Sequence, residues 1–449
     1  MTASHKLARM SVTFDDPSLI ANAGLLLPGT LAAHLDVQGV IDARVDLSGR
    51  TGGANTGIKA MTVISALLAG AEWIDDVDVL RAGASEAVLG HEVRAPSTIG
   101  TWLRAFTWGH TRQLDAAAGA VLARAWAAGA GPGRTEAVTI DLDSTHCRTY
   151  GLAKQGAWKV DRHGERGYHP VVAVVDGYDQ VLATRLREGP ANDGRGAASF
   201  LTETLGRVRT AGARGPVTVR ADSGFFGRPL LAACRTADVR FSVTVRMNSY
   251  LRGAVDDIDE AAWTPIPREQ WQPNDGVAEV AEVRVPAFKG DTEAVRLVVR
   301  RVNPKAAKPG EDPQLLPDWR HHAFVTDIVG TTTLAADTWH RAHAQVENVI
   351  KDLKHHGGLA HLPSGVFAAN AAWLSLVALA HNLGRWTLRL GKGIDCFSSA
   401  KTLRRKLIAW PARIARRGRQ VFLHGPTDWP WAHEAHVMLA RLRALPAPP

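Results

Sequence analysis

The sequence predicts an α/β protein whose central part follows the element order βββαβαβ, and three observations support this prediction. Short apolar runs with strand-type alternation recur between residues 137 and 245, and segments with helical spacing separate the later ones. Before and after this part, apolar residues recur with helical periodicity. The chain has 449 residues, of which 45% are hydrophobic and 22% charged, as in a folded globular protein with a sizeable core.

The central elements follow from periodicity and turn signals. The turn Asp176-Gly-Tyr-Asp179 separates two apolar runs, as in a β-hairpin or meander. Two of the predicted strands end in acidic residues, at Asp143 and at Asp222. The expected strands are 137–143, 168–175, 181–187, 217–222 and 239–245, and the expected helices are 196–208 and 229–236.

Changes of character along the chain predict five regions. They are an N-terminal helical domain (1–130), the first part of the core (134–248), a β-rich insertion (249–335), two further core helices (336–390) and a basic helical C-terminal region (391–449). The amphipathic stretch 95–110 could be the second helix of a DNA-reading helix-turn-helix, although most such helices are ordinary core elements.

Cysteine usage and the apolar runs indicate a cytoplasmic protein. Cys147, Cys234 and Cys396 are isolated and odd in number, so they form neither a disulfide framework nor a zinc knuckle. The N-terminal sequence has no apolar signal core, and the most apolar run, 366–380, is too short to cross a membrane. We therefore expect no membrane association.

Positive charge is concentrated near the C-terminus. The chain has 53 Lys and Arg against 44 Asp and Glu, a net charge of +9. Residues 385–419 contain eleven Lys and Arg, Arg404, Arg405 and Lys406 among them, and a single acid, Asp395. Such a run is either a solvated helix face or the contact surface for a polyanion, and it lacks the apolar face of a membrane-binding helix.

Three carboxylates on unlike elements form the candidate site. Asp143 and Asp222 end two predicted strands, and Glu347 lies within a long helix expected over residues 334–354. Residues at the carboxyl ends of neighbouring strands converge on one edge of a sheet, and a crossing helix can add a third ligand. Such an oxygen site suits two Mg²⁺ ions and in-line phosphoryl chemistry. Asp141 shares the strand face of Asp143, so both remain candidates for the first ligand.

One face of the predicted long helix combines an acid with two cations. Glu347, Lys351 and Lys354 follow each other at i, i+4 and i+7, and Arg341 lies about 120° away. An ordinary Glu–Lys surface pair would have the same spacing, so this string alone decides nothing.

Taken together, these strings resemble the DDE transposases of bacterial insertion sequences, and most closely the insertion-sequence-1380 family. The resemblance covers most of the chain. The motifs that carry it are Ile140-Asp-Leu-Asp-Ser-Thr, Lys154-Gln-Gly-Ala157, Gly167-Tyr-His-Pro170, Ala191-Asn-Asp-Gly-Arg-Gly196, Arg220-Ala-Asp-Ser-Gly224, and Glu347 with Lys354 seven residues later.

The resemblance implies a ribonuclease-H-like catalytic core, interrupted by a β-rich insertion before the helix with the final Glu. Asp143, Asp222 and Glu347 would bind two Mg²⁺ ions, with Mn²⁺ as a substitute, and the family-like Asp-Ser-Thr pattern favours Asp143 over Asp141. It further implies cut-and-paste transposition by a homodimer acting on inverted-repeat ends and target DNA in the bacterial nucleoid.

Basic residues around the triad are expected to contact DNA phosphates: Lys351, Lys354, Lys154, Arg341, Arg404, Arg405 and Lys406. Related groups have Tyr and Arg ahead of the Glu, where this chain has Trp339, His340 and Arg341, which leaves the role of Arg341 open. Two alternatives remain: a catalytically inactive DNA-binding regulator, and a structure-selective nuclease that cuts without joining.

Overall fold

A nine-stranded mixed sheet forms the centre of the computed structural model, which describes residue 7 and residues 9–159, 164–271, 277–303, 318–393 and 399–446. Its strand order is β10-β11-β12-β13-β9-β8-β2-β6-β7. The strands, in chain order, are β2 (Val138–Ser144), β6 (Val171–Val175), β7 (Gln180–Arg185), β8 (Val217–Ala221), β9 (Arg240–Thr244), β10 (Thr264–Pro265), β11 (Val277–Pro286), β12 (Ala294–Asn303) and β13 (Arg320–Thr326).

The central strands confirm the predicted order βββαβαβ. Strands β2, β6 and β7 are followed by α8 (Ala197–Thr210), β8, α9 (Arg228–Thr236) and β9. Strands β2, β8 and β9 run parallel, whereas β6 and β7 are antiparallel to their neighbours. Between β2 and β6 lies a small sheet that we did not expect from the sequence, with β3 (Cys147–Arg148), β4 (Trp158–Lys159) and β5 (Arg166–Tyr168) in the order β3-β5-β4.

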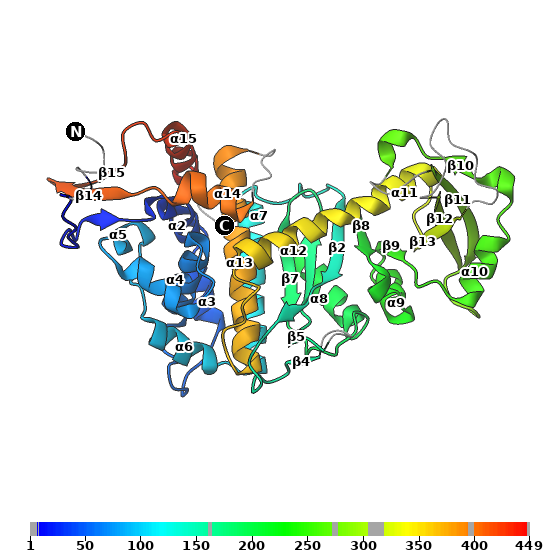
Figure 1. Ribbon diagram of the computed structural model, residues 1–449, viewed down its shortest axis with the longest axis horizontal. Helices are drawn as coiled ribbons and strands as arrows, with labels where there is room; N and C mark the ends of the chain where they lie inside the picture. Colours follow the sequence, from blue (N-terminus) through cyan, green and yellow to red (C-terminus); the bar gives the residue numbers. More distant parts are fainter. Residues whose placement is uncertain are drawn as a thin grey trace.

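The strands of the β-rich insertion continue the central sheet. Strand β13 pairs with β9 in antiparallel fashion, and β12, β11 and β10 follow outward. A separate apolar cluster, with Val280, Val298 and Phe324 at its centre, packs this end of the sheet. Helix α10 (Ser249–Asp256) leads into the insertion, at the end of the molecule opposite the N-terminal helices (Figure 1).

The N-terminal part is helical, as predicted. Its helices are α2 (Leu26–His34), α3 (Val37–Arg44), α4 (Thr56–Ala69), α5 (Glu86–Leu89), α6 (Pro96–Arg104) and α7 (Trp108–Ala127). Helix α13 (Phe367–Lys392) is buried along most of its length and packs against both this part and strand β7. No single helix of the described ranges is long and apolar enough to cross a membrane; two bent helix pairs pass by length and composition alone.

The long helix expected over 334–354 is interrupted. It consists of α11 (Thr333–Arg341), a 3₁₀ turn at Ala342–Ala344 and α12 (Gln345–His356). Together they run from the insertion across the sheet to its centre, and they are drawn in yellow in Figure 1. Apolar side chains on one side of α12, at Val346, Val349 and Leu353, are buried, so the opposite side faces outward.

The C-terminal region is not helical throughout, which corrects the prediction. It contains α14 (Ala400–Leu403), a π-helical turn (Arg404–Ile408) and α15 (Ala432–Arg443), but residues between them form the hairpin β14 (Ala412–Arg417) and β15 (Gln420–His424). Pro411 follows the last helical turn and cannot continue it, and Gly418, with φ +59°, turns the hairpin. Strand β14 also pairs with β1 (Leu19–Ile20), so the two ends of the chain share one small sheet. Asp395 and Cys396 lie outside the described residues.

Candidate active site

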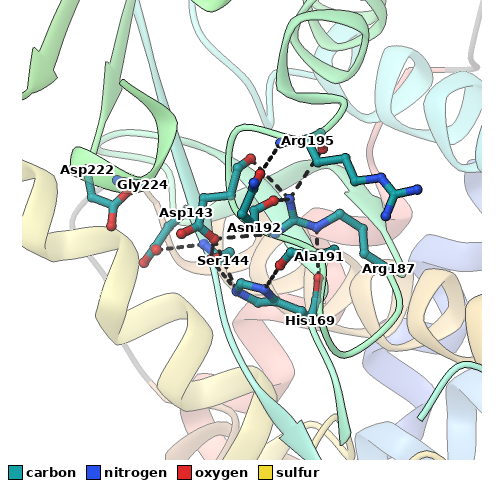
Figure 2. A network of polar contacts seen from close by, with 10 residues as sticks. Asp143, Ser144, His169, Arg187, Ala191, Asn192, Arg195, Asp222 and Gly224 are labelled. Atoms are coloured by element: carbon teal, nitrogen blue, oxygen red, sulfur yellow. Dashed lines mark hydrogen bonds and ion pairs between the residues drawn. The ribbon is translucent and has the colours of Figure 1, made fainter. Parts of the chain in front are cut away.

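Asp143 and Asp222 lie side by side at the carboxyl edge of two parallel strands. The last pair in the register of β2 and β8 is Leu142 with Ala221, and each aspartate is the next residue on its strand. Neighbouring strands are about 4.8 Å apart, so this register alone brings the two carboxylates together. Asp222 is fixed by its own turn, because its Oδ1 accepts a hydrogen bond from the Gly224 amide at 3.0 Å (Figure 2).

Asp141 lies on the same face of β2 but is fully engaged by an arginine. The Arg220 side chain donates from Nε to Asp141 Oδ1 at 2.7 Å and from its terminal nitrogen to Oδ2 at 2.8 Å. Asp141 is 1% exposed and Arg220 is fully buried. A second carboxylate, that of Asp176, lies 2.9 Å from Arg220. Both oxygens of Asp141 are therefore committed to the protein interior, and Asp143 is the carboxylate that reaches the edge.

Glu347 occupies the first turn of α12, which packs over β2 and β6. Its buried neighbours Val346, Val349 and Ile350 face the sheet, whereas Glu347 itself is exposed. Its negative charge nevertheless raises the pKa of Asp143. The third predicted carboxylate is therefore close enough to Asp143 to act on its charge, but its exposed side chain is not grouped with the two strand-end aspartates.

The carboxylates repel one another. Burial raises the pKa of Asp143, and the negative charges of Asp222 and Glu347 raise it further, against a hydrogen bond from the Ser144 amide and the positive charge of His343. Burial also raises the pKa of Asp222, and the nearby charge of Asp193 adds to this increase. Such a set of mutually repelling oxygens favours a bound cation.

A network of polar side chains holds the end of β2 in place (Figure 2). The Ser144 hydroxyl donates a short hydrogen bond to Asp193 Oδ1 and lies 2.9 Å from His169 Nε2. His169 Nε2 is also 3.1 Å from the same Asp193 oxygen, and Arg187 donates to the backbone carbonyl of His169 at 2.9 Å. Burial opposes ionisation of Asp193, yet the hydrogen bonds from His169 and Ser144 and the charge of Arg187 hold its pKa well below the usual range.

Asp193 also lies against the turn that bears Asp222. A β-carbon added to Gly224 would lie 2.1 Å from Asp193 Oδ2, so only glycine fits there. One side chain therefore connects the residue after Asp143 with the turn after Asp222. We infer that this loop sets the separation of the two strand-end carboxylates.

The sequence reading did not identify four residues of this site as functional: His343, Arg220, Asp193 and His169. His343 Nδ1 lies 2.9 Å from Asp141 Oδ1, and the imidazole lies near enough to Asp143 and Asp222 to lower the pKa of both when protonated. His343 is four residues before Glu347, so helical spacing puts both on one face of the predicted helix. This spacing was the sequence feature that could have identified His343. The other three occur in the recognised motifs but carried no assigned role.

The lysines predicted to contact DNA differ in their surroundings. Lys351 is exposed on α12. Lys354 donates to the His146 carbonyl at 3.0 Å and to the Thr145 hydroxyl at 3.3 Å, so it ties α12 to the loop after Asp143. Lys154 donates to the Leu362 carbonyl, and burial lowers its pKa.

The predicted arginine contacts are partly engaged within the protein. Arg341 pairs with Asp337 at 3.1 Å. Arg404 is half-buried and donates to the carbonyls of Leu67, Leu68 and His356, so its guanidinium caps the C-terminal ends of α4 and α12. Arg405 is exposed, and the Lys406 ammonium lies 5.6 Å from the Trp431 ring. The structure thus gives Arg404 a packing role where a DNA contact was expected.

The site fits divalent cations by the chemistry of its donors. Asp143, Asp222 and Glu347 supply carboxylate oxygens, which hard cations such as Mg²⁺ prefer. In the described part of the chain, however, no three His, Cys, Asp or Glu side chains are already grouped tightly enough to hold a metal ion. Glu347 is the member on the outer face, so we expect its side chain to turn inward when a cation binds.

Similarity to known proteins shows the family of this chain. No curated protein matches the sequence. Among solved structures, one similar chain is the piggyBac transposase in a synaptic complex with hairpin DNA, at 12% identity and a TM-score of 0.45, covering 86% of this chain and 79% of that one. The family model described as "Transposase DDE domain group 1" matches residues 3–447. The chain therefore belongs to the group 1 family of DDE transposases.

Proposed function

We propose that this protein cleaves DNA at the inverted-repeat ends of an insertion sequence and joins those ends to target DNA, with Asp143, Asp222 and Glu347 as its catalytic carboxylates. The register of β2 and β8 is the observation that carries this proposal, because it leaves Asp143 and Asp222 adjacent, and among the described residues neither has an arginine partner like that of Asp141. Family membership supplies the reaction class.

The order and direction of the central strands support a ribonuclease-H-like core. The order β7-β6-β2-β8-β9 corresponds to 3-2-1-4-5 in order of appearance, with the first, fourth and fifth strands parallel. We extend the proposal to membership of the insertion-sequence-1380 family and to a bacterial, nucleoid-associated protein. The supporting motifs are those of the strand ends and of α12.

We propose that Asp143, Asp222 and Glu347 hold two Mg²⁺ ions, or Mn²⁺ as a substitute. Bound there, the ions would lower the pKa of an attacking oxygen and stabilise charge on phosphate oxygens. The chain itself orients the carboxylates: Gly224 donates to Asp222, and the Ser144 amide donates to Asp143 at 2.6 Å. His343, in the turn before α12, adds positive charge beside them when it is protonated, and Lys351 faces solvent on α12, where it can contact a phosphate.

Two displacements would follow at this site. In the first, a water oxygen bonds to phosphorus and the bond to the 3′ oxygen breaks, which releases a 3′-hydroxyl and leaves a 5′-phosphate. In the second, that 3′-hydroxyl attacks a phosphorus of target DNA, so that one phosphodiester forms as another breaks. Two DNA ends must be joined together, and we therefore propose a homodimer in the DNA complex.

The test is an assay with labelled duplexes that carry the ends of the element, with Mg²⁺ and the full chain. We expect nicked and joined products with the parent protein and neither product with Asp143→Asn, Asp222→Asn or Glu347→Gln. All three variants should still bind DNA, because the carboxylates contribute no phosphate contact. Strand transfer retained by any of them would refute the assignment.

The same assay separates the alternatives. Tight, salt-sensitive binding without metal-dependent nicking would indicate a DNA-binding regulator. Nicked product without joined product would indicate a nuclease. A regulator has no need of a metal-binding carboxylate pair, and family membership favours a transposase over a nuclease that only cuts.

A further inference from the structure

The hairpin of β14 and β15 carries positive charge that the other described residues neutralise only in part. Residues 412–424 contain four arginines and no acidic residue. Arg413 pairs with Asp16 at 2.6 Å. Arg416, Arg417 and Arg419 are exposed and have no ion pair with any of the described residues. Three free guanidinium groups therefore lie at the tip of one hairpin.

The two faces of this hairpin differ. Directly paired residues share a face, and faces alternate along each strand. Ile414 and Leu423 form one such pair and pack against the core, and the exposed pair Arg416–Val421 continues this face beyond the core, toward the tip. The opposite face carries the pairs Arg413–His424, Ala415–Phe422 and Arg417–Gln420, whose side chains are polar or aromatic except that of Ala415. One face thus fixes the hairpin to the protein, and the other is available to a partner.

The hairpin lies away from the carboxylates. Figure 1 shows β14 and β15 projecting at the end of the molecule that holds the N-terminal helices, whereas β2 and α12 lie at its centre. A partner bound to the hairpin would therefore leave the carboxylate edge accessible. A long, uniformly charged polyanion could contact both places at once.

From these observations we infer that the β14–β15 hairpin is a DNA-binding ribbon, which contacts duplex DNA outside the cleavage point. This inference rests on the proposed function, because it takes DNA as the substrate. A two-stranded ribbon fits the major groove, and arginines at its tip can pair with phosphates on either side. Phe422, 39% exposed, would then contact base edges.

The experiment measures binding of the full chain to a labelled 30-base-pair duplex of arbitrary sequence in EDTA, at several salt concentrations. The variant R416A/R417A/R419A should bind about tenfold more weakly or worse, and its salt slope should flatten by about 2 to 3 units, because each lost phosphate contact removes about 0.9. The matched variant R416K/R417K/R419K keeps the charge and should keep the slope.

A further variant, Phe422→Ala, should weaken binding about threefold or more at an unchanged slope, since an apolar contact releases no counterions. Unchanged affinity and slope in the triple alanine variant, with its thermal midpoint preserved, would overturn the inference. Loss of slope in the lysine variant as well would also overturn it, because the effect would then come from a distorted hairpin.

Failure of this inference is distinguishable from failure of the proposed function. The hairpin is tested by binding without metal, whereas the carboxylates are tested by metal-dependent cleavage. A triple alanine variant that binds like the parent protein and still cuts element ends would refute DNA binding by the hairpin and leave the proposed function intact. If the parent protein binds DNA through the hairpin but never cuts it, the proposed function fails and the inference about the hairpin holds.

Discussion

Two aspartates on strand β2, two residues apart and on the same face, have opposite surroundings. Asp141 is buried, accepts hydrogen bonds from two nitrogens of Arg220, and lies 2.9 Å from His343 Nδ1. Asp143 lies at the strand end beside Asp222, and its pKa is raised by burial and by the charges of Asp222 and Glu347. The first environment neutralises a carboxylate and the second concentrates negative charge. The comparison shows that position along the strand, measured against one arginine on β8, separates a structural acid from a candidate catalytic one.

The largest expected difference between the two concerns catalysis. Asp143→Asn should reduce metal-dependent cleavage by at least about a thousandfold, or about 4 kcal/mol, because the site loses a charged metal ligand. Initial rates on a labelled duplex at saturating Mg²⁺ measure this loss. Circular dichroism should show an unchanged fold. A rate within about tenfold of the parent protein would mean that Asp143 is not a ligand.

For stability we expect the substitution of Asp141, and not that of Asp143, to have the larger effect. Asp141→Asn should lower the free energy of unfolding by about 3 kcal/mol, at the lower end for a broken buried ion pair because Asp176 still neutralises Arg220. Urea denaturation followed by tryptophan fluorescence provides the measurement. Asp143→Asn, as the matched variant, should not be destabilised, since it removes repulsion. Equal destabilisation of both variants would mean that Asp141 and Asp143 contribute alike to stability.

An intermediate effect should come from the loop that joins the two strand ends. Asp193→Asn should weaken Mg²⁺ binding about 10- to 100-fold, as substitutions behind metal ligands typically do, because Ser144 and the turn at Gly224 lose their common anchor. The Mg²⁺ concentration at half-maximal cleavage reports this change. Glu293→Gln, an exposed acid far along the chain, is the control and should leave that concentration unaltered.

The smallest effect separates two lysines on α12. Lys351→Ala should weaken DNA binding a few-fold and flatten the salt slope by about 0.9, as expected for one exposed phosphate contact. Lys354→Ala should instead leave the slope nearly unchanged and slow cleavage, because Lys354 holds the loop after Asp143. Binding titrations at several salt concentrations test both. If only Lys354→Ala flattened the salt slope, Lys354 would be the phosphate contact and Lys351 would not.

Much of the fold followed from local patterns. Strand alternation ending in acid identified β2 and β8, helical spacing identified α8, α9 and α13, and the order βββαβαβ was correct. The interrupted helix over 333–356 and the hairpin over 412–424 were missed. In the hairpin, the high density of arginine suggested a helix, but Pro411, Gly418 and pairing with β1 at the other end of the chain favour strands.

Sequence alone therefore determined the local elements and the carboxylates at their ends, because periodicity, turn residues and motif strings act over a few positions. Only the tertiary structure decided the surroundings of particular side chains. It pairs Asp141, and not Asp143, with the buried Arg220, and it makes Lys354, and not Lys351, hold the loop after Asp143. These properties depend on partners far along the chain, such as Arg220 for Asp141, and on the register that brings them within hydrogen-bonding distance.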